Sequence, residues 1–330
     1  MGNRIQWIDT AKGLGLLLVF IGHMHPVYIS TWIYTCHMPL FFFLSGFVFT
    51  LHPWRTFIHK KISRLVIPYF FLGLVIYLFY AAIYIYQHRE IQDYMLLLRN
   101  LLEQKAFWTI WFLAALFCGE IILWIILKMC KLHLLYAFIL SVCIMSGAFV
   151  YYRNGGSTLY WCFDVGCVSQ FFILLGYILK RNYADVKSYI SRCNRTLLLT
   201  VLFAVNLLSG FACIRLSHSQ LDMSVGLYGN EILTLISAMS GIGALILLCQ
   251  MVSNRFLRYL GENTMIFFAW HSRIILVACG MVYGALGLFQ SSDILNQYLY
   301  CVVSLIVILA VLYPVTEGIK KTKFRHLFGV

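Results

Sequence analysis

The sequence predicts an all-α, polytopic integral membrane protein with about ten transmembrane helices. Hydrophobic residues make up 62% of the 330 residues and charged residues only 11%, whereas soluble domains are about a quarter charged. The mean hydropathy is +0.83. The apolar residues fall in successive runs close to the length of about 20 residues that crosses a bilayer. Together these observations exclude an ordinary soluble domain.

Ten apolar segments are the expected spans. They cover residues 13–31, 34–51, 65–86, 106–127, 132–150, 166–180, 196–214, 231–250, 263–283 and 297–316. No Pro/Gly/Ser-rich linker interrupts them, so residues 1–330 are expected to form a single transmembrane domain. The N-terminal apolar run lacks a small-residue cleavage site, and we expect it to remain as the first span rather than to be removed as a signal peptide.

The basic residues predict which side of the membrane each loop faces. With ten spans, 19 of the 25 Lys and Arg residues, Arg4 among them, fall on the side that holds both termini, and five, including Lys105, on the other. Because cytoplasmic loops are enriched in Lys and Arg, both termini are expected in the cytoplasm of a multi-pass protein of the cytoplasmic (inner) membrane. Topology thus explains the net charge of +13. Membrane lipids are expected partners, and nucleic acid is not.

Ionisable side chains inside the spans are the first functional candidates, because charge at membrane depth is costly and is usually tied to function. Helix rise places His23 about 16 Å above Lys12, close to the middle of the bilayer. Ser45 and His271, from two other spans, reach a similar depth. This convergence predicts a buried site. Further candidates at depth or near the outer mouth are His37, Glu120, Asp164 and Arg273.

The first span contains the strongest pattern. Lys12 and His23 are 11 residues apart, about three helical turns, and therefore share one helix face. His25 points to nearly the opposite side, which argues against a His-x-His metal pair. The 11 cysteines form no Cys-x-x-Cys pair, and no metal is expected. Pro26 is expected to kink this span.

The stretch "RTFIHKKISRLVIPY" follows the second expected span. Lys61 and Arg64 occupy neighbouring positions of a helix at the cytoplasmic interface. They could anchor the chain among lipid headgroups or bind a phosphate-bearing ligand. Glu120 could pair with a cation or a histidine, or be a protonated packing residue. In the second span, Gly46 is expected to allow close helix approach beside Ser45.

Several stretches resemble the membrane acyltransferase 3 family. They are WIDTAKGLGLLLVFIGH, HMPLFFFLSGFVF, KKISRLVIPYF, FFILLGYILKR and LRYLGENTMIFFAWH. The resemblance covers essentially the whole chain and is strongest to the fucose-4-O-acetylase-like branch. The family's motif of a basic residue, ten intervening residues and a histidine falls on Lys12 and His23. Its Arg-x-x-Arg motif falls on Lys61 and Arg64, where Lys keeps the charge but loses the bidentate geometry.

The resemblance implies transfer of an acyl group from cytoplasmic acyl-CoA, usually acetyl-CoA, to a hydroxyl of a cell-surface or lipid-linked saccharide. His23 is then the expected general base or acyl carrier. Ser45 is either an acyl relay or a hydrogen-bonding and packing residue. The other expected site residues are, for catalysis, Ser45, His271 and Glu120; for acyl-CoA, Lys12, Lys61 and Arg64; and for the acceptor, His37, Asp164 and Arg273.

These substrates predict a continuous cavity from the cytoplasm beside Lys12, past His23, to an outer opening near His37 and Ser45, because CoA phosphates cannot enter hydrocarbon. The main alternative is a polytopic transporter or exporter of saccharides or small solutes, which also places polar groups at the midplane. A structural or sensory membrane protein is a third possibility. Against a carrier, the sequence has no two-half repeat, and a basic helix face below His23 has no purpose there.

Overall fold

The computed structural model describes residues 5–26, 29–104, 109–218, 220–252, 254–289 and 293–329. Within these ranges the chain is helical and contains no strand, only an isolated bridge between Asp222 and Leu227. The all-α prediction is confirmed for them. Arg4 and Lys105 of the topology argument, residues 27–28 of the first expected span and residues 106–108 of the fourth lie outside the described residues.

In the described part of the chain, eight helical segments are long and apolar enough to cross a membrane. They support a polytopic membrane protein, while the number ten and the side on which the termini lie remain predictions. The eight are Trp54–Tyr86, composed of α4 (Trp54–Lys61), η1 (Ile62–Val66) and α5 (Ile67–Tyr86); α7 (Trp111–Met129); α8 (Leu134–Arg153); η2 (Tyr160–Cys162) with α9 (Phe163–Arg181); α11 (Arg195–Ser217); α12 (Glu231–Met251); Thr264–Ala285, composed of α14 (Thr264–Trp270), η4 (His271–Leu276) and α15 (Val277–Ala285); and α16 (Ile294–Lys320). The other helices are α1 (Gln6–His23), α2 (Ile29–Ile33), α3 (His37–Phe47), α6 (Ile91–Glu103), α10 (Tyr183–Arg192), η3 (Met223–Val225), α13 (Arg255–Glu262) and η5 (Arg325–Phe328).

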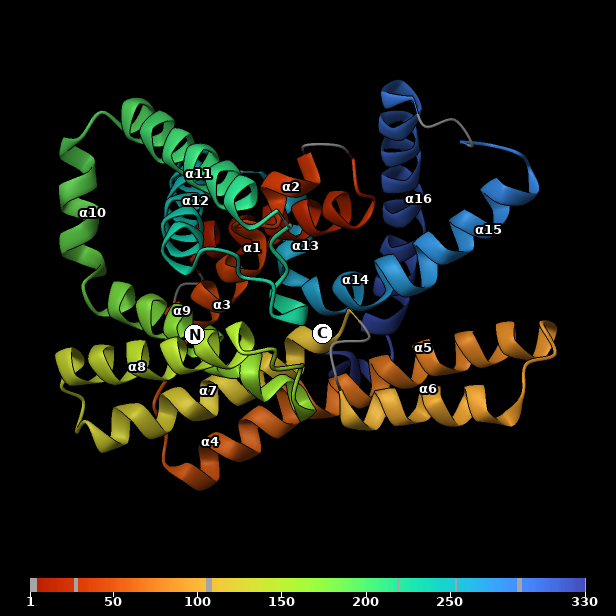
Figure 1. Ribbon diagram of the computed structural model, residues 1–330, viewed down its shortest axis with the longest axis horizontal. Helices are drawn as coiled ribbons and strands as arrows, with labels where there is room; N and C mark the ends of the chain where they lie inside the picture. The colour runs from red at the N-terminus through yellow and green to blue at the C-terminus, as the bar shows by residue number, and fades with distance from the viewer. Residues whose placement is uncertain are drawn as a thin grey trace.

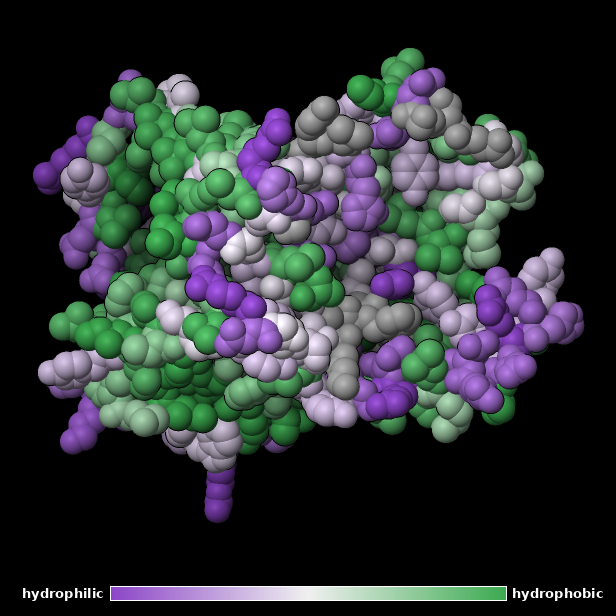
Figure 2. All heavy atoms as spheres, viewed as in Figure 1, coloured by the Kyte–Doolittle hydropathy of each residue, from purple (hydrophilic) through white to green (hydrophobic). Residues whose placement is uncertain are grey.

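The apolar surfaces of several long helices agree with a bilayer setting. In Figure 1, α5, α7, α8 and α9 run in similar directions, and α10 lies across one end, where it joins α9 to α11. Figure 2 shows hydrophobic residues over much of α8 and α11 and hydrophilic residues over α10. Leu208 of α11 is 72% exposed and Leu135 of α8 is 68% exposed. Apolar surface of this extent is typical of helices that contact lipid.

The first expected span, residues 13–31, takes a different form. α1 begins at Gln6 and ends at His23, before Pro26, so the expectation that Pro26 kinks a continuing helix is wrong. The residue before a proline is disfavoured in the helical conformation. His25 has a φ of 53°, in the left-handed region, which also does not continue a right-handed helix. His23 therefore lies at the end of a helix, where the chain turns, rather than in the middle of one.

The second expected span, residues 34–51, is also different. Its helix, α3, has 11 residues and is about 16 Å long, about half the thickness of the hydrocarbon layer. Ten of those 11 residues are buried. The apolar run in this segment therefore packs against protein, and hydropathy alone could not distinguish that environment from lipid.

Two pairs of glycines hold α1 and α3 close to their neighbours. A Cβ atom at Gly13 or at Gly261 would lie 1.9 or 1.8 Å from a carbonyl oxygen of the other helix, so α1 and α13 touch through their backbones. Gly46 and Gly176 do the same for α3 and α9, with distances of 1.9 and 2.0 Å. The expected close approach at Gly46 is confirmed. These contacts set the positions of the two helices that carry His23 and His37.

Candidate active site

The last residue of α1, His23, contacts the first residue of η4, His271. The distance from His271 Nε2 to His23 Nδ1 is 3.3 Å, and the ring centroids are 4.9 Å apart at an interplanar angle of 77°. His271 is fully buried, and His23 is partly buried. Helix rise predicted that the two residues reach a similar depth. The structure adds that their rings touch.

Backbone carbonyls decide which ring nitrogens carry protons. His271 Nδ1 lies 2.9 Å from the carbonyl oxygen of Phe268 and 3.1 Å from that of Phe267. Because a carbonyl only accepts, Nδ1 of a neutral His271 is the donor, and its Nε2 presents a lone pair. His23 Nδ1 faces this lone pair and lies 2.9 Å from the Val19 carbonyl oxygen. His23 is thus protonated at Nδ1 in its neutral form and keeps a lone pair on Nε2.

Both described π-helical segments carry predicted site residues. η4 begins at His271, and η1 contains Arg64. In η1 the local cause is Pro68, because a proline cannot donate to the carbonyl four residues before it and its ring clashes with that carbonyl. Widened turns of this kind are frequent at functional sites. In η4 the turn presents the His271 ring to α1.

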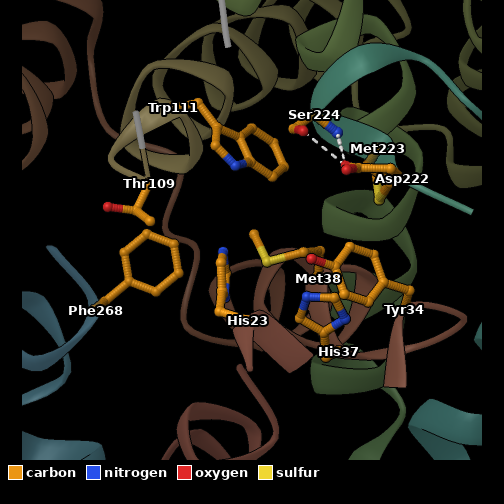
Figure 3. A pocket seen from close by; sticks show the side chains of 10 residues that line it. All are labelled: His23, Tyr34, His37, Met38, Thr109, Trp111, Asp222, Met223, Ser224 and Phe268. Carbon is orange, nitrogen blue, oxygen red and sulfur yellow. Dashed lines mark hydrogen bonds between the residues drawn. The ribbon is translucent and has the colours of Figure 1, made fainter. Parts of the chain in front are cut away.

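A cavity of about 50 Å³ lies in front of His23. Figure 3 shows side chains from α1, α3, α7, α14 and the segment before α12 around it. His37 donates from Nδ1 to the Ile33 carbonyl oxygen at 2.8 Å, so its other nitrogen is an acceptor. The cavity is lined by His23, Tyr34, His37, Met38, Thr109, Trp111, Asp222, Met223, Ser224 and Phe268.

Asp222 belongs to a tight turn on one side of this cavity. Its carboxylate accepts hydrogen bonds from the Ser224 backbone N–H at 2.8 Å and from the Ser224 hydroxyl at 2.7 Å. The turn is closed by the bridge to Leu227 and by Gly226, whose φ is 74°. Sequence reasoning missed Asp222 because it considered ionisable groups within spans. The available signal was an acidic residue followed by turn glycines between two long apolar helices.

A second cavity, of about 200 Å³, lies beside Lys12. Ser45 lines this cavity and not the one that contains His37, so the expectation that Ser45 and His37 share an outer opening is wrong. α3 is long enough, about 12 Å from His37 to Ser45, to reach both cavities with opposite ends. The Ser45 hydroxyl donates to the Phe41 carbonyl oxygen at 2.9 Å. Phe268 lines both cavities, which are thus separate spaces that share one wall.

Two further predicted residues pair with each other. Lys61 Nζ lies 2.7 Å from Glu120 Oε1, and the two side chains are 20% and 4% exposed. The Lys61 ammonium also lies 5.6 Å from the ring centroid of Phe57. Neither residue lines the two cavities as described, so the structure does not bring Glu120 to His23. Arg64 is exposed. Of the three cations expected to bind acyl-CoA, Lys12 is the one that lines either described cavity, that of about 200 Å³.

The other acceptor candidates, Asp164 and Arg273, are not among the described residues that line the cavity in front of His23. Asp164 is 3% exposed and accepts a hydrogen bond from the Leu159 backbone N–H at 3.0 Å, which stabilises the start of α9. Arg273 lies in η4, two residues after His271, and is partly buried. Of the residues expected to contact the acceptor, His37 is the one that lines the cavity in the described chain.

Comparison with known proteins identifies a family. Residues 5–313 match the acyltransferase 3 family, described as an acyltransferase domain. None of the curated proteins and none of the solved structures compared with the chain matches it. The family match spans nearly the whole chain, and the long apolar helices agree with an acyltransferase embedded in a membrane. The chain belongs to the acyltransferase 3 family.

Proposed function

We propose that this protein is an O-acyltransferase that moves an acyl group from acyl-CoA on the cytoplasmic side to a hydroxyl of a saccharide on the other side of the membrane. The observation that carries the proposal is the orientation of His23. Its Nδ1 is held by the Val19 carbonyl and by His271, and its Nε2 is the nitrogen left for the cavity. A lone pair held in this way is suited to accept a proton.

In the proposed step, His23 Nε2 removes the proton from the acceptor hydroxyl while the hydroxyl oxygen attacks the thioester carbonyl carbon. A carbon–oxygen bond forms, the carbon–sulfur bond breaks, and the CoA sulfur takes the proton back from Nε2. The products are an ester and CoA thiol. The charge that develops on His23 is favoured by His271, because a lone pair on His271 Nε2 accepts from the protonated Nδ1 of His23.

The donor is proposed to enter through the cavity beside Lys12. This cavity lies nearer to the start of α1 than the cavity in front of His23, and Lys12 is about 16 Å from His23 along the helix. Lys12 supplies a positive charge, and Phe41 and Phe112 supply apolar surface for the arm of CoA. Lys12 lines this cavity and Arg64 is exposed, so both are candidates for phosphate contacts.

The acceptor is proposed to be a saccharide, cell-surface or lipid-linked, because the cavity wall in front of His23 combines polar and aromatic groups. Asp222 accepts hydrogen bonds, the Tyr34 hydroxyl donates or accepts, and Trp111 offers an amphipathic ring. A few polar groups among aromatic rings are typical of small-molecule sites. His37 adds an acceptor nitrogen on the same side.

The test uses the purified full chain in detergent with acetyl-CoA labelled in the acetyl group and a panel of monosaccharide and disaccharide glycosides. We expect CoA thiol release together with a labelled ester, and neither product from the His23→Ala variant. Label that stays on the protein when no acceptor is present, and that peptide mapping places on His23, would assign His23 the role of acyl carrier. Saccharide movement across proteoliposomes without any ester would contradict the proposal and favour a transporter.

A further inference from the structure

The two cavities along α1 meet at the side chain of Phe268. Among the described lining residues, it is the one that belongs to both the His23 cavity, of about 50 Å³, and the Lys12 cavity, of about 200 Å³. The neighbouring positions divide between the two spaces. On α7, Trp111 lines the first cavity and Phe112 the second. Figure 3 shows the Phe268 ring at the edge of the first cavity, on the side away from Asp222.

We propose that Phe268 sets the length of the acyl group that can react at His23, and that it restricts the donor to short acyl thioesters such as acetyl-CoA. This inference rests on the proposed acyl transfer. A thioester that enters beside Lys12 must pass the Phe268 ring before its carbonyl carbon meets His23. The acyl group then has to share the space beyond that ring with the acceptor hydroxyl.

Aromatic neighbours hold the Phe268 ring in this position. Its centroid lies 5.5 Å from that of Phe112 and 6.4 Å from that of Phe41, both on the Lys12 side. Phe268 is 5% exposed, and its carbonyl oxygen accepts the hydrogen bond from His271 Nδ1. The backbone at this position is therefore fixed by the same contact that orients the histidine pair, and the ring is the part that turns aside to let a thioester pass.

The size of the His23 cavity limits what it can hold. At about 50 Å³, the His23 cavity has about a quarter of the volume of the Lys12 cavity, of about 200 Å³, so it is the narrower of the two spaces and suits a short acyl group. A butyryl or hexanoyl chain would press against Phe268, Met38 or Trp111 in the closed wall. Removal of the Phe268 ring would join this space to the larger cavity and make room for the longer chains.

The experiment compares the full-length wild type with Phe268→Ala, Phe268→Leu and the matched control Phe171→Ala. Phe171, on α9, is buried to a similar extent but is not among the residues that line either cavity. Transfer is measured from acetyl-, butyryl- and hexanoyl-CoA into the saccharides of native membranes that contain each variant. We expect the wild type to prefer acetyl-CoA. We expect Phe268→Ala to raise the butyryl-to-acetyl ratio of kcat/KM by at least about tenfold, the scale of pocket-size discrimination, and Phe171→Ala to leave that ratio unchanged.

Each outcome separates this inference from the proposed function. A wild type that transfers no acyl group from any thioester contradicts the proposed function itself. A wild type that transfers acetyl and butyryl equally well, or an unchanged ratio in Phe268→Ala, overturns the role of Phe268 and leaves acyl transfer standing. An equal shift in Phe171→Ala does the same. If Phe268→Ala does not fold, Phe268→Leu replaces it, with a smaller shift in the same direction expected and no shift overturning the inference.

Discussion

Two polar clusters lie among the membrane helices, and they differ in what surrounds the atom that has no hydrogen-bond partner in the described part of the chain. In the cluster of Lys61 and Glu120, opposite charges meet at 2.7 Å outside the two described cavities, and Glu120 Oε2 is buried without such a partner. In the cluster of His23 and His271, one ring orients the other, and a nitrogen remains toward a cavity. An ionisable residue at membrane depth is thus a candidate for chemistry when its neighbours satisfy one atom and leave another facing open space. Depth alone does not separate the two cases.

The largest effect on acyl transfer is expected when the His23 side chain is replaced. His23→Ala and His23→Gln are expected to reduce acyl transfer by about 10²- to 10⁴-fold, the usual contribution of a positioned general base. Acyl-CoA affinity, measured by calorimetry, and thermal unfolding in detergent are expected to stay close to wild type, because His23 lies at the end of α1. Near-normal turnover in both variants would remove His23 from the mechanism.

Substitutions in the ion pair of Lys61 and Glu120 are expected to change the stability of the protein and not its turnover. Lys61→Met or Glu120→Leu alone leaves the other charge largely buried and is expected to lower the free energy of unfolding by about 3 kcal/mol. The double variant is expected to recover most of that loss. Chemical unfolding of all four proteins gives the coupling energy. A double variant that is stable but binds acyl-CoA poorly would indicate that Lys61 contacts acyl-CoA.

His271 is expected to act as a positioning residue. His271→Ala removes one hydrogen-bond acceptor for His23 and is expected to lower kcat about tenfold with little change in KM, because a hydrogen bond to the positive charge that develops on His23 contributes roughly 1.5 kcal/mol. His271→Gln retains an acceptor oxygen and is expected to recover part of the rate. If His271→Ala changes stability alone, or if His271→Gln is no better, the residue has a packing role.

The smallest effect is expected at the Asp222 turn. Asp222→Asn keeps the shape of the side chain but removes its charge, and weaker hydrogen bonds to acceptor hydroxyls are expected to raise the acceptor KM about fivefold. The KM for acyl-CoA is expected to be unaffected, since Asp222 lines the His23 cavity and not the Lys12 cavity. Steady-state kinetics with each substrate varied in turn checks this. Equal changes in both KM values would contradict a role confined to the acceptor.

The membrane class and the main helices were predictable because hydropathy and helical period are local properties of the chain. The runs that became α8, α11 and α16 were located to within a few residues, since most of their surface is apolar and unbroken. The first two expected spans were not. Hydropathy does not distinguish a segment enclosed by protein, such as α3, from one in lipid, and it did not register that Pro26 and His25 end α1 at His23.

The sequence by itself determined that Lys12 and His23 share one helix and that His23 and His271 reach a similar depth, because both follow from helix rise and period. Only the tertiary structure decided that the two rings touch, that Glu120 meets Lys61, that Asp222 reaches the His23 cavity and that Phe268 divides two cavities. Each of these contacts joins residues far apart in the chain. Such contacts depend on how helices cross. The sequence marks a glycine that permits close approach, as at Gly46, but it does not say which helix lies against that glycine.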